Sequence, residues 1–406
     1  MACGQILRGG LVADASGDAM ILYLAATALV ILFASRVPAL RERTLFCDSA
    51  PRPYISRQVL TGKVLTAGIF LILFGLLALR INVGNDYAKY VEFMHLARFF
   101  AYVPTEIGFN LLSFLVFTAC GEENFLICFA VIAAITVGCF LLAIDRLADS
   151  FFLSFSMFML LGYYFQSFST VRYYLALSVT TLAIVYLFRR DIPRFVLLVL
   201  FAATFHKSAL VVLVLYPFAA LSFSKWIFLI ISAAGAVGLF FRSQVLYVML
   251  RLYPTYQETT LAEGGEGSLV SIIRCAAVLL LVFFFDRKSF TGIKAAAEDP
   301  DKRQRCFYCH CTLLALVLYL CFSYLPVVSR IGYYLTITQI FYVPKLIRRI
   351  PSRIQRLLAA GLVAVFCLGF FVLMMRRAAG DGIRILPYQT FIFHDMPPIL
   401  SDVGYN

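Results

Sequence analysis

The sequence predicts an all-α fold, a polytopic transmembrane helical bundle of about ten to twelve membrane segments. Of the 406 residues, 62% are hydrophobic and only 14% are charged, and the mean hydropathy is +0.88. A soluble domain of this composition would aggregate through exposed apolar surface. The apolar residues gather in runs that approach the roughly 20 residues needed to cross a bilayer, and not in the alternating strands of a barrel. The candidate membrane segments are residues 20–34, 64–79, 107–120, 124–144, 151–168, 171–188, 195–218, 226–241, 269–285, 306–325, 328–346 and 357–375.

Basic residues cluster in three of the loops between these segments, namely 35–63, 286–305 and 345–356. Because short basic loops stay in the cytoplasm, we expect these three to be cytoplasmic and loops 80–106 and 242–268 to be extracytoplasmic. The formal net charge of +13 then reflects topology. Since the sequence offers no soluble domain to hold such a site, we expect no nucleic-acid binding. We expect residues 1–406 to form a single integral membrane domain.

Two of the twelve segments are doubtful as single crossings. Segment 107–120 is short, and segment 195–218 is interrupted by His206 and Lys207. If every segment crosses, the arginines at 189, 190 and 194 fall on the extracytoplasmic side, against the charge rule. If the first segment is re-entrant and the second is a pair of half-helices, these arginines move to the cytoplasm. Irregular backbone is tolerated at membrane depth where protein or a wet cavity surrounds it, so we favour this version over twelve plain crossings.

Polar residues that could carry chemistry begin in loop 80–106. Asp86 or Glu106 could act as a general base toward a sugar hydroxyl, and Tyr87 and Tyr90 offer flat apolar faces with a hydroxyl, which suit sugar rings. The alternative is that Asp86 only pairs with a neighbouring Arg80 or Lys89 and caps a helix.

Cations farther along the chain could bind an anion. Arg172 lies at the mouth of an apolar segment, where a guanidinium is costly unless it is paired or binds a group such as phosphate. Its alternative is snorkelling to the interface. His206 could move a proton or donate to a leaving phosphate, beside the point charge of Lys207; the alternative is a buried histidine bonded to a carbonyl. Arg330, followed by Tyr333, opens a segment on the extracytoplasmic side and is a second candidate anion ligand.

No metal or other cofactor is predicted. Cys306, Cys309 and His310 have the spacing of a c-type haem attachment site, but they follow a loop predicted to be cytoplasmic, the wrong side for that attachment. A zinc site would need a second ligand pair, which the sequence does not offer. Phosphate-binding loops, dinucleotide-binding turns and Asp-x-Asp motifs are also missing from the sequence, so the donor is expected to be lipid-linked.

Several of these residues resemble the motifs of the EpsG family, which is similar to the Wzy-type polymerases of O-antigen and exopolysaccharide synthesis. The matching motifs run in order from Arg80-x-x-x-Gly84-x-Asp86-Tyr87-x-x-Tyr90 through Glu106-x-Gly108-Phe109, Arg172-x-x-x-Ala176 and Phe205-His206-Lys207-Ser208-Ala209 to Arg330-x-x-Tyr333 and Leu386-Pro387-Tyr388. Two positions depart from the expected pattern without removing a charge: Asn85 follows the glycine and Tyr173 follows the arginine. The glycan preference could therefore differ from that of other members.

The resemblance implies a multi-pass glycosyltransferase of the bacterial cytoplasmic (inner) membrane. It would join undecaprenyl-diphosphate-linked repeat units on the extracytoplasmic face, for exopolysaccharide, capsule or O-antigen synthesis. Its catalytic residues would be Asp86, Glu106 and His206, and its substrate-binding residues Arg80, Tyr87, Tyr90, Arg172, Lys207, Arg330 and Tyr333. Partners would be the lipid-linked glycan, the bilayer and other polysaccharide-assembly membrane proteins.

Two other functions stay open at this point. A C-superfamily glycosyltransferase would add single sugars from a polyprenyl-phosphate donor and would also use an external carboxylate. A flippase or transporter of the lipid-linked glycan would often show paired broken helices in two corresponding halves, whereas this sequence suggests one break, at His206.

Overall fold

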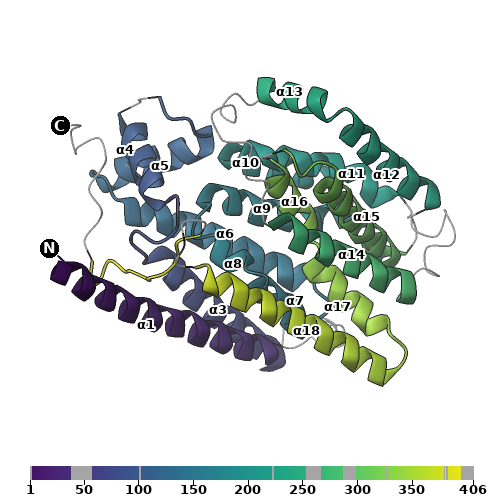
Figure 1. Ribbon diagram of the computed structural model, residues 1–406, viewed down its shortest axis with the longest axis horizontal. Helices are drawn as coiled ribbons and strands as arrows, with labels where there is room; N and C mark the ends of the chain where they lie inside the picture. Colours follow the sequence, from purple (N-terminus) through teal and green to yellow (C-terminus); the bar gives the residue numbers. More distant parts are fainter. Residues whose placement is uncertain are drawn as a thin grey trace, which may run out of the picture. The chain divides into compact units, whose positions relative to one another are not determined.

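A computed structural model (Figure 1) describes most of the chain. The described residues are 2–37, 57–99, 102–221, 224–252, 267–286, 299–325, 327–378, 380 and 383–394. Within them the regular structure is helical, and an isolated antiparallel bridge joins Arg80 to Thr390. The central parts of the loops predicted at 35–63, 242–268 and 286–305 lie outside the described residues.

The chain divides into two compact units. The first unit comprises Met1–Leu182, Leu200–Lys207 and Ala360–Asn406. Its complete helices are α1 (Ala2–Ser35), α3 (Arg57–Ala78), α4 (Tyr87–Arg98), α5 (Ile107–Cys120), α6 (Phe125–Leu147), α7 (Phe151–Leu160) and α8 (Tyr163–Gln166). Helix α3 packs against α1 and α6, and α4 packs against α5.

The second unit comprises Ala183–Val199 and Ser208–Ala359. Helices that run from one unit into the other are α9 (Val171–Phe188), α10 (Ile192–Phe205), the 3-10 helix η1 (Lys207–Leu215) and α18 (Arg353–Arg376). The helices wholly within the second unit are α11 (Tyr216–Ala220), α12 (Lys225–Phe240), α13 (Arg242–Leu252), α14 (Gly267–Phe285), α15 (Pro300–Cys321), α16 (Val328–Thr336) and α17 (Gln339–Arg349). Helix α15 is the core of this unit, because α11, α12, α14, α16 and α17 all pack against it.

The predicted polytopic helical bundle is confirmed. In the described part of the chain, five helices are long and apolar enough to cross a membrane: α3, α6, α9, α15 and α18. The bent pair α12–α13 makes a sixth candidate, and further apolar helices of 10–17 residues accompany them. Burial separates central from lipid-facing helices, since 83% of the most apolar window of α9 is buried but only 17% of that of α18. Apolar side chains left exposed along α18 are what a lipid-facing helix requires.

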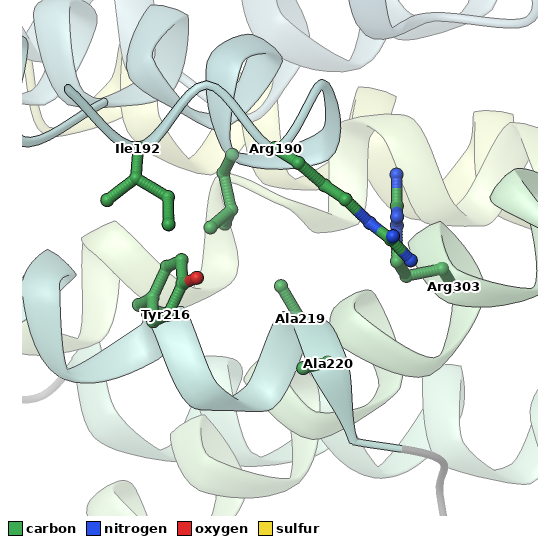
Figure 2. Close-up of a pocket in the computed structure, with 7 residues that line it drawn as sticks. Arg190, Ile192, Tyr216, Ala219, Ala220 and Arg303 are labelled. Atoms are coloured by element: carbon green, nitrogen blue, oxygen red, sulfur yellow. The ribbon is translucent and has the colours of Figure 1, made fainter. Parts of the chain in front are cut away.

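The predicted break in segment 195–218 is confirmed. Helix α10 ends at Phe205, His206 is not helical, and the chain continues as η1. Farther on, Tyr216 in α11 lies beside Phe195 near the start of α10, with ring centroids 6.2 Å apart. Ile192 and Tyr216 line the same pocket (Figure 2). The chain that leaves this pocket at Ile192 has therefore returned to it by Tyr216, which contradicts a plain crossing by this segment.

The other doubtful segment, 107–120, forms the single helix α5. Its 14 residues extend about 21 Å at 1.5 Å per residue, short of the roughly 30 Å hydrocarbon core. The re-entrant path for this helix stays a prediction.

Two predicted loops contain helices that hydropathy did not reveal. Helix α4 occupies much of loop 80–106, and α13 occupies the start of loop 242–268. Helix α13 is bent by 82° from α12, so it does not continue that span in a straight line. Polar and charged residues in both helices keep either one from registering as a membrane segment by itself.

An ion-pair network ties together the ends of the basic loops in the second unit. Arg305 binds both Asp286, at 2.5 Å, and Asp301, at 2.9 Å. Lys345 lies 2.7 Å from Asp301, and Arg349 lies 3.1 Å from Asp286. The side chain of Asp286 is 0% exposed, so removing both of its cations would leave an unpaired buried charge, at a cost of about 3–5 kcal/mol. The basic residues in loops 286–305 and 345–356, from which the topology was predicted, therefore also stabilise the second unit through ion pairs.

Candidate functional site

The loop before α4 is fixed by a glycine that allows close backbone contact. Gly84 has φ +104°, and a side chain there would overlap the carbonyl of Phe168. Its N–H donates to the carbonyl of Arg384 at 2.8 Å, and the N–H of Asn85 donates to the Ser169 hydroxyl at 3.2 Å. A residue with a Cβ would strain this turn and push the loop away. Gly84 thus sets the position of Asp86, two residues further along the chain.

Arg80 is fully enclosed in the first unit. Its side chain is among the largest fully buried ones, at 1% exposure, and Nη1 donates to the Phe168 carbonyl at 2.5 Å. The guanidinium also lies over the rings of Phe168, at 4.9 Å, and Phe129, at 5.6 Å. Burial lowers the pKa of Arg80 to about 10, so the group stays charged at neutral pH. The aromatic faces and the carbonyl stabilise this cation.

Asp86 lies in the same loop as Arg80 but is less buried. It precedes α4 and is half-buried. Its carboxylate does not cap the helix, and within the described residues it pairs with neither Arg80 nor Lys89, contrary to the alternative drawn from the sequence. The next residue, Tyr87, is 0% exposed and stacks on Phe129 at 4.6 Å.

Glu106 connects three segments of the first unit. It precedes α5, and its Oε2 accepts a hydrogen bond from Nη1 of Arg172 at the start of α9. Its other oxygen, Oε1, accepts from the backbone N–H of Lys207 at 3.2 Å. The side chains of Glu106 and Arg172 are 20% and 15% exposed, so the pair is shielded but reachable. One carboxylate thus holds both a cation and the irregular backbone at the helix break.

Aromatic rings flank Arg172. Its guanidinium carbon lies 5.6 Å from the ring centre of Tyr90 and 5.5 Å from that of Phe109. The Tyr90 and Phe109 rings are themselves 5.7 Å apart. Tyr90 lies one turn into α4 from Asp86, since the Tyr90 N–H donates to the Asp86 carbonyl. The arginine is therefore restrained by a carboxylate and two ring faces.

A second glycine brings the helix break to this carboxylate. A side chain at Gly108 would overlap both the backbone and the hydroxyl of Thr204, near the end of α10. The close approach lets the N–H of Lys207 reach Glu106. His206, at the break, is half-buried, and its ring meets that of Tyr173 edge-on at 5.3 Å. The side chain of Lys207 is exposed.

The structure thus gathers Tyr90, Glu106, Arg172, His206 and Lys207 in one region of the first unit, named here the Glu106 cluster. Arg330 and Tyr333 belong to α16 in the second unit, where Arg330 is exposed and Tyr333 is half-buried. Residues that the sequence did not single out are Phe109 and Tyr173, which supply ring faces, and Thr204, which supplies the close contact. Phe109 was visible as the last residue of the Glu106 motif and Tyr173 as the departure after Arg172, whereas Thr204 carried no signal.

The sequence of the chain was compared with those of known protein families. The model of the EpsG family matches residues 63–390. The chain belongs to the EpsG family. Neither the search of curated proteins nor that of solved structures found a match. EpsG membership, together with helices able to span a membrane, makes this a multi-pass membrane protein of the exopolysaccharide-related, polymerase type.

The matched region contains every motif residue that the sequence suggested. It begins in α3 and ends at Thr390, the bridge partner of Arg80. The C-terminal motif of this EpsG chain packs on the end of α3, since the Tyr388 hydroxyl donates to the Leu76 carbonyl at 3.1 Å.

The cysteine motif of α15 lies inside the second unit. Cys306, Cys309 and His310 are each 0% exposed. The described residues contain no group of three or more His, Cys, Asp or Glu side chains arranged to hold a metal ion.

Proposed function

We propose that this EpsG-family chain joins oligosaccharide repeat units carried on undecaprenyl diphosphate, on the extracytoplasmic face of the bacterial cytoplasmic membrane. The observation that carries the proposal is the Glu106 cluster, where one carboxylate restrains a shielded arginine beside a helix break. A restrained cation in a partly dry site is well suited to stabilise the charge that develops on a leaving diphosphate.

Arg172 is the proposed diphosphate ligand. A guanidinium has five N–H donors, and Glu106 engages Nη1, so donors remain for phosphate oxygens. Tyr90 and Phe109 fix the plane of the group, which reduces the entropy lost when an anion binds. Lys207 would add a second positive charge, and His206 a hydrogen bond.

Asp86 is the proposed general base. Both oxygens of Glu106 accept hydrogen bonds, from Arg172 and from the Lys207 N–H, so they are already engaged and suit Glu106 to a positioning role. Asp86 is half-buried and pairs with no described residue, so it is available for a sugar hydroxyl. The acceptor hydroxyl would attack the anomeric carbon of a second unit. Its proton would pass to Asp86, and the bond from that carbon to the diphosphate oxygen would break.

The remaining predicted ligands take different roles in this proposal. The burial of Arg80 and Tyr87 supports a structural role, in which they hold the loop that carries Asp86. For Arg330 and Tyr333, the family resemblance alone supports substrate binding.

Purified protein in lipid nanodiscs, supplied with a lipid-diphosphate-linked oligosaccharide, tests the proposal. We expect a ladder of polymer lengths from the wild type. Asp86→Asn should slow its formation by about 10²–10⁴-fold, the usual contribution of a general base. Arg172→Ala should abolish long products, while Arg146→Ala, a change of a 51% exposed arginine at the end of α6, should not.

The same assay separates the rival functions. Extension by one sugar from a polyprenyl-phosphate monosaccharide would identify a single-sugar transferase. Movement of the lipid-linked unit across a vesicle without any new glycosidic bond would identify a transporter. Either result would overturn the polymerase proposal.

A further inference from the structure

The second unit contains a pocket that the proposed polymerase chemistry does not use. Its volume is about 250 Å³, many times the roughly 10–15 Å³ that one water needs. Its lining combines two arginines, Arg190 and Arg303, with the ring of Tyr216 and aliphatic side chains from the ends of α9, α10 and α11 (Figure 2). No carboxylate is among the lining residues, so both charges on its wall are positive.

Backbone geometry directs the first arginine into this pocket. Arg190 has φ +60° in the tight turn between α9 and α10, where its N–H donates to the Leu187 carbonyl at 3.2 Å. The acidic residue of the turn, Asp191, is engaged by Arg194 at 3.2 Å, and neither of these two lines the pocket. The turn therefore separates its one carboxylate from the pocket and leaves Arg190 on the pocket wall.

The second arginine carries an unsatisfied donor. Arg303, in the first turn of α15, donates from Nη2 to the carbonyl of Phe188, the last residue of α9. Its Nε is buried and has no hydrogen-bond partner. A buried N–H without a partner has lost its hydrogen bond to water and gained none in return, which is unfavourable, and more so for a charged group. The site is thus short of an acceptor at a defined atom.

The two guanidinium groups also act on each other. Arg190 and Arg303 are close enough to interact electrostatically, and Figure 2 shows their ends side by side. The two positive charges repel each other. An anion bound between them would be attracted by both guanidinium groups and would offset this repulsion. Arginine pairs bind phosphate through several parallel hydrogen bonds, and the Nε of Arg303 supplies one more donor.

We propose that Arg190 and Arg303 form a binding site for a phosphate group. The apolar wall made by Ile192, Ala219 and Tyr216 accommodates carbon atoms attached to that phosphate. The site lies where a helix pair ends beside a basic turn, so a phospholipid headgroup and a free phosphate are its two sources of ligand.

Lipid and phosphate binding by the full-length protein in detergent distinguish these sources. One arm measures bound phosphatidylglycerol, against phosphatidylcholine, by native mass spectrometry. The other arm measures the shift of thermal unfolding with inorganic phosphate, against equal ionic strength of chloride. Saturable binding in the first arm alone identifies a lipid headgroup, and in the second alone a free phosphate; both outcomes support the site.

Arg190→Gln is the test variant, because this exposed side chain can be changed with little risk to folding. We expect it to weaken binding at least tenfold, and Arg190→Gln combined with Arg303→Gln to weaken it further. The matched control is Arg194→Gln, in the first turn of α10, 69% exposed and outside the pocket; it should bind like the wild type. Equal binding by the wild type and the Arg190→Gln variant, or no saturable binding in either arm, would overturn the proposal.

Discussion

The relation between Glu106 and Arg172 can be tested by a double-mutant cycle. The variants are Glu106→Gln, Arg172→Gln and the two combined. Glutamine keeps the size of the glutamate but has one acceptor oxygen where the carboxylate has two. It can therefore serve either Arg172 or the Lys207 N–H, and its NH₂ group then faces the other donor.

The magnitude follows from the contacts. A hydrogen bond to a charged group contributes about 1.5–3 kcal/mol. Because the two side chains are 20% and 15% exposed, solvent screens them in part and the lower end of that range applies. A loss of about 2 kcal/mol in the positioning of Arg172 corresponds to a thirty-fold slower reaction, at about 1.4 kcal/mol per factor of ten. Arg172→Gln itself removes the cation and should slow polymerisation by about 10²–10³-fold.

The assay is the rate of polymer formation in nanodiscs, with thermal unfolding temperatures to check that each variant is folded. If Glu106 acts through Arg172, the double variant should be no slower than Arg172→Gln alone, which gives a coupling of about 2 kcal/mol. If Glu106 is instead an independent base, the two losses should multiply. A double variant about thirty-fold slower than Arg172→Gln would refute a role of Glu106 exerted through Arg172 alone.

Three further predictions concern the glycine turn before α4, the buried Arg80 and the membrane topology of the turn at Arg190. Gly84→Ala should destabilise the protein by about 1–3 kcal/mol from backbone strain alone, while Gly75→Ala, which meets nothing within 4 Å, should be neutral or stabilising; equal unfolding temperatures would contradict this. Arg80→Met should lower the unfolding temperature but leave polymer length intact at permissive temperature, because Arg80 is 1% exposed; normal stability with lost polymer would instead restore a substrate-binding role. Arg190→Cys should resist a membrane-impermeant thiol reagent added outside cells, because the turn at Arg190 is predicted to face the cytoplasm. As a control, Tyr102→Cys, at an 88% exposed position, should react above the background of the native cysteines. Labelling of Arg190→Cys would contradict the predicted cytoplasmic location of this turn.

Much of the helical framework could be predicted because length and hydropathy are local properties. The predicted segments 107–120 and 171–188 coincide with α5 and α9, and the break at His206 was visible as two polar residues within an apolar run. Helix α13 was not predicted, and α4 was expected only in the alternative in which Asp86 caps a helix, since polar residues hide both from a hydropathy window. The ion pair between Asp301 and Arg305 has helical i,i+4 spacing and could have been recognised in the sequence. The pair between Asp286 and Arg305 joins distant positions that only the folded structure brings together.

The roles of individual cations could not be predicted, because they depend on residues far away in the sequence. Arg80 and Arg172 are both arginines next to apolar segments, and the family resemblance implied substrate binding for both. The carbonyl that binds Arg80 belongs to Phe168, 88 positions away, and the carboxylate that binds Arg172 lies 66 positions away. Hydropathy and spacing carry no trace of these partners.

The contrast between these two arginines has a consequence for catalysis. Arg80 is a buried cation held by ring faces and a carbonyl, so an anion could reach it only by opening the first unit. Arg172 is reachable, but Glu106 neutralises its charge, and a neutral pair offers limited attraction to a diphosphate with more than one negative charge. The proposed site therefore needs a second cation beside the pair. Lys207 meets this need, because Glu106 fixes its backbone N–H while its side chain is exposed. We therefore propose that Lys207, at the helix break, supplies the second positive charge beside an arginine whose own charge is already balanced.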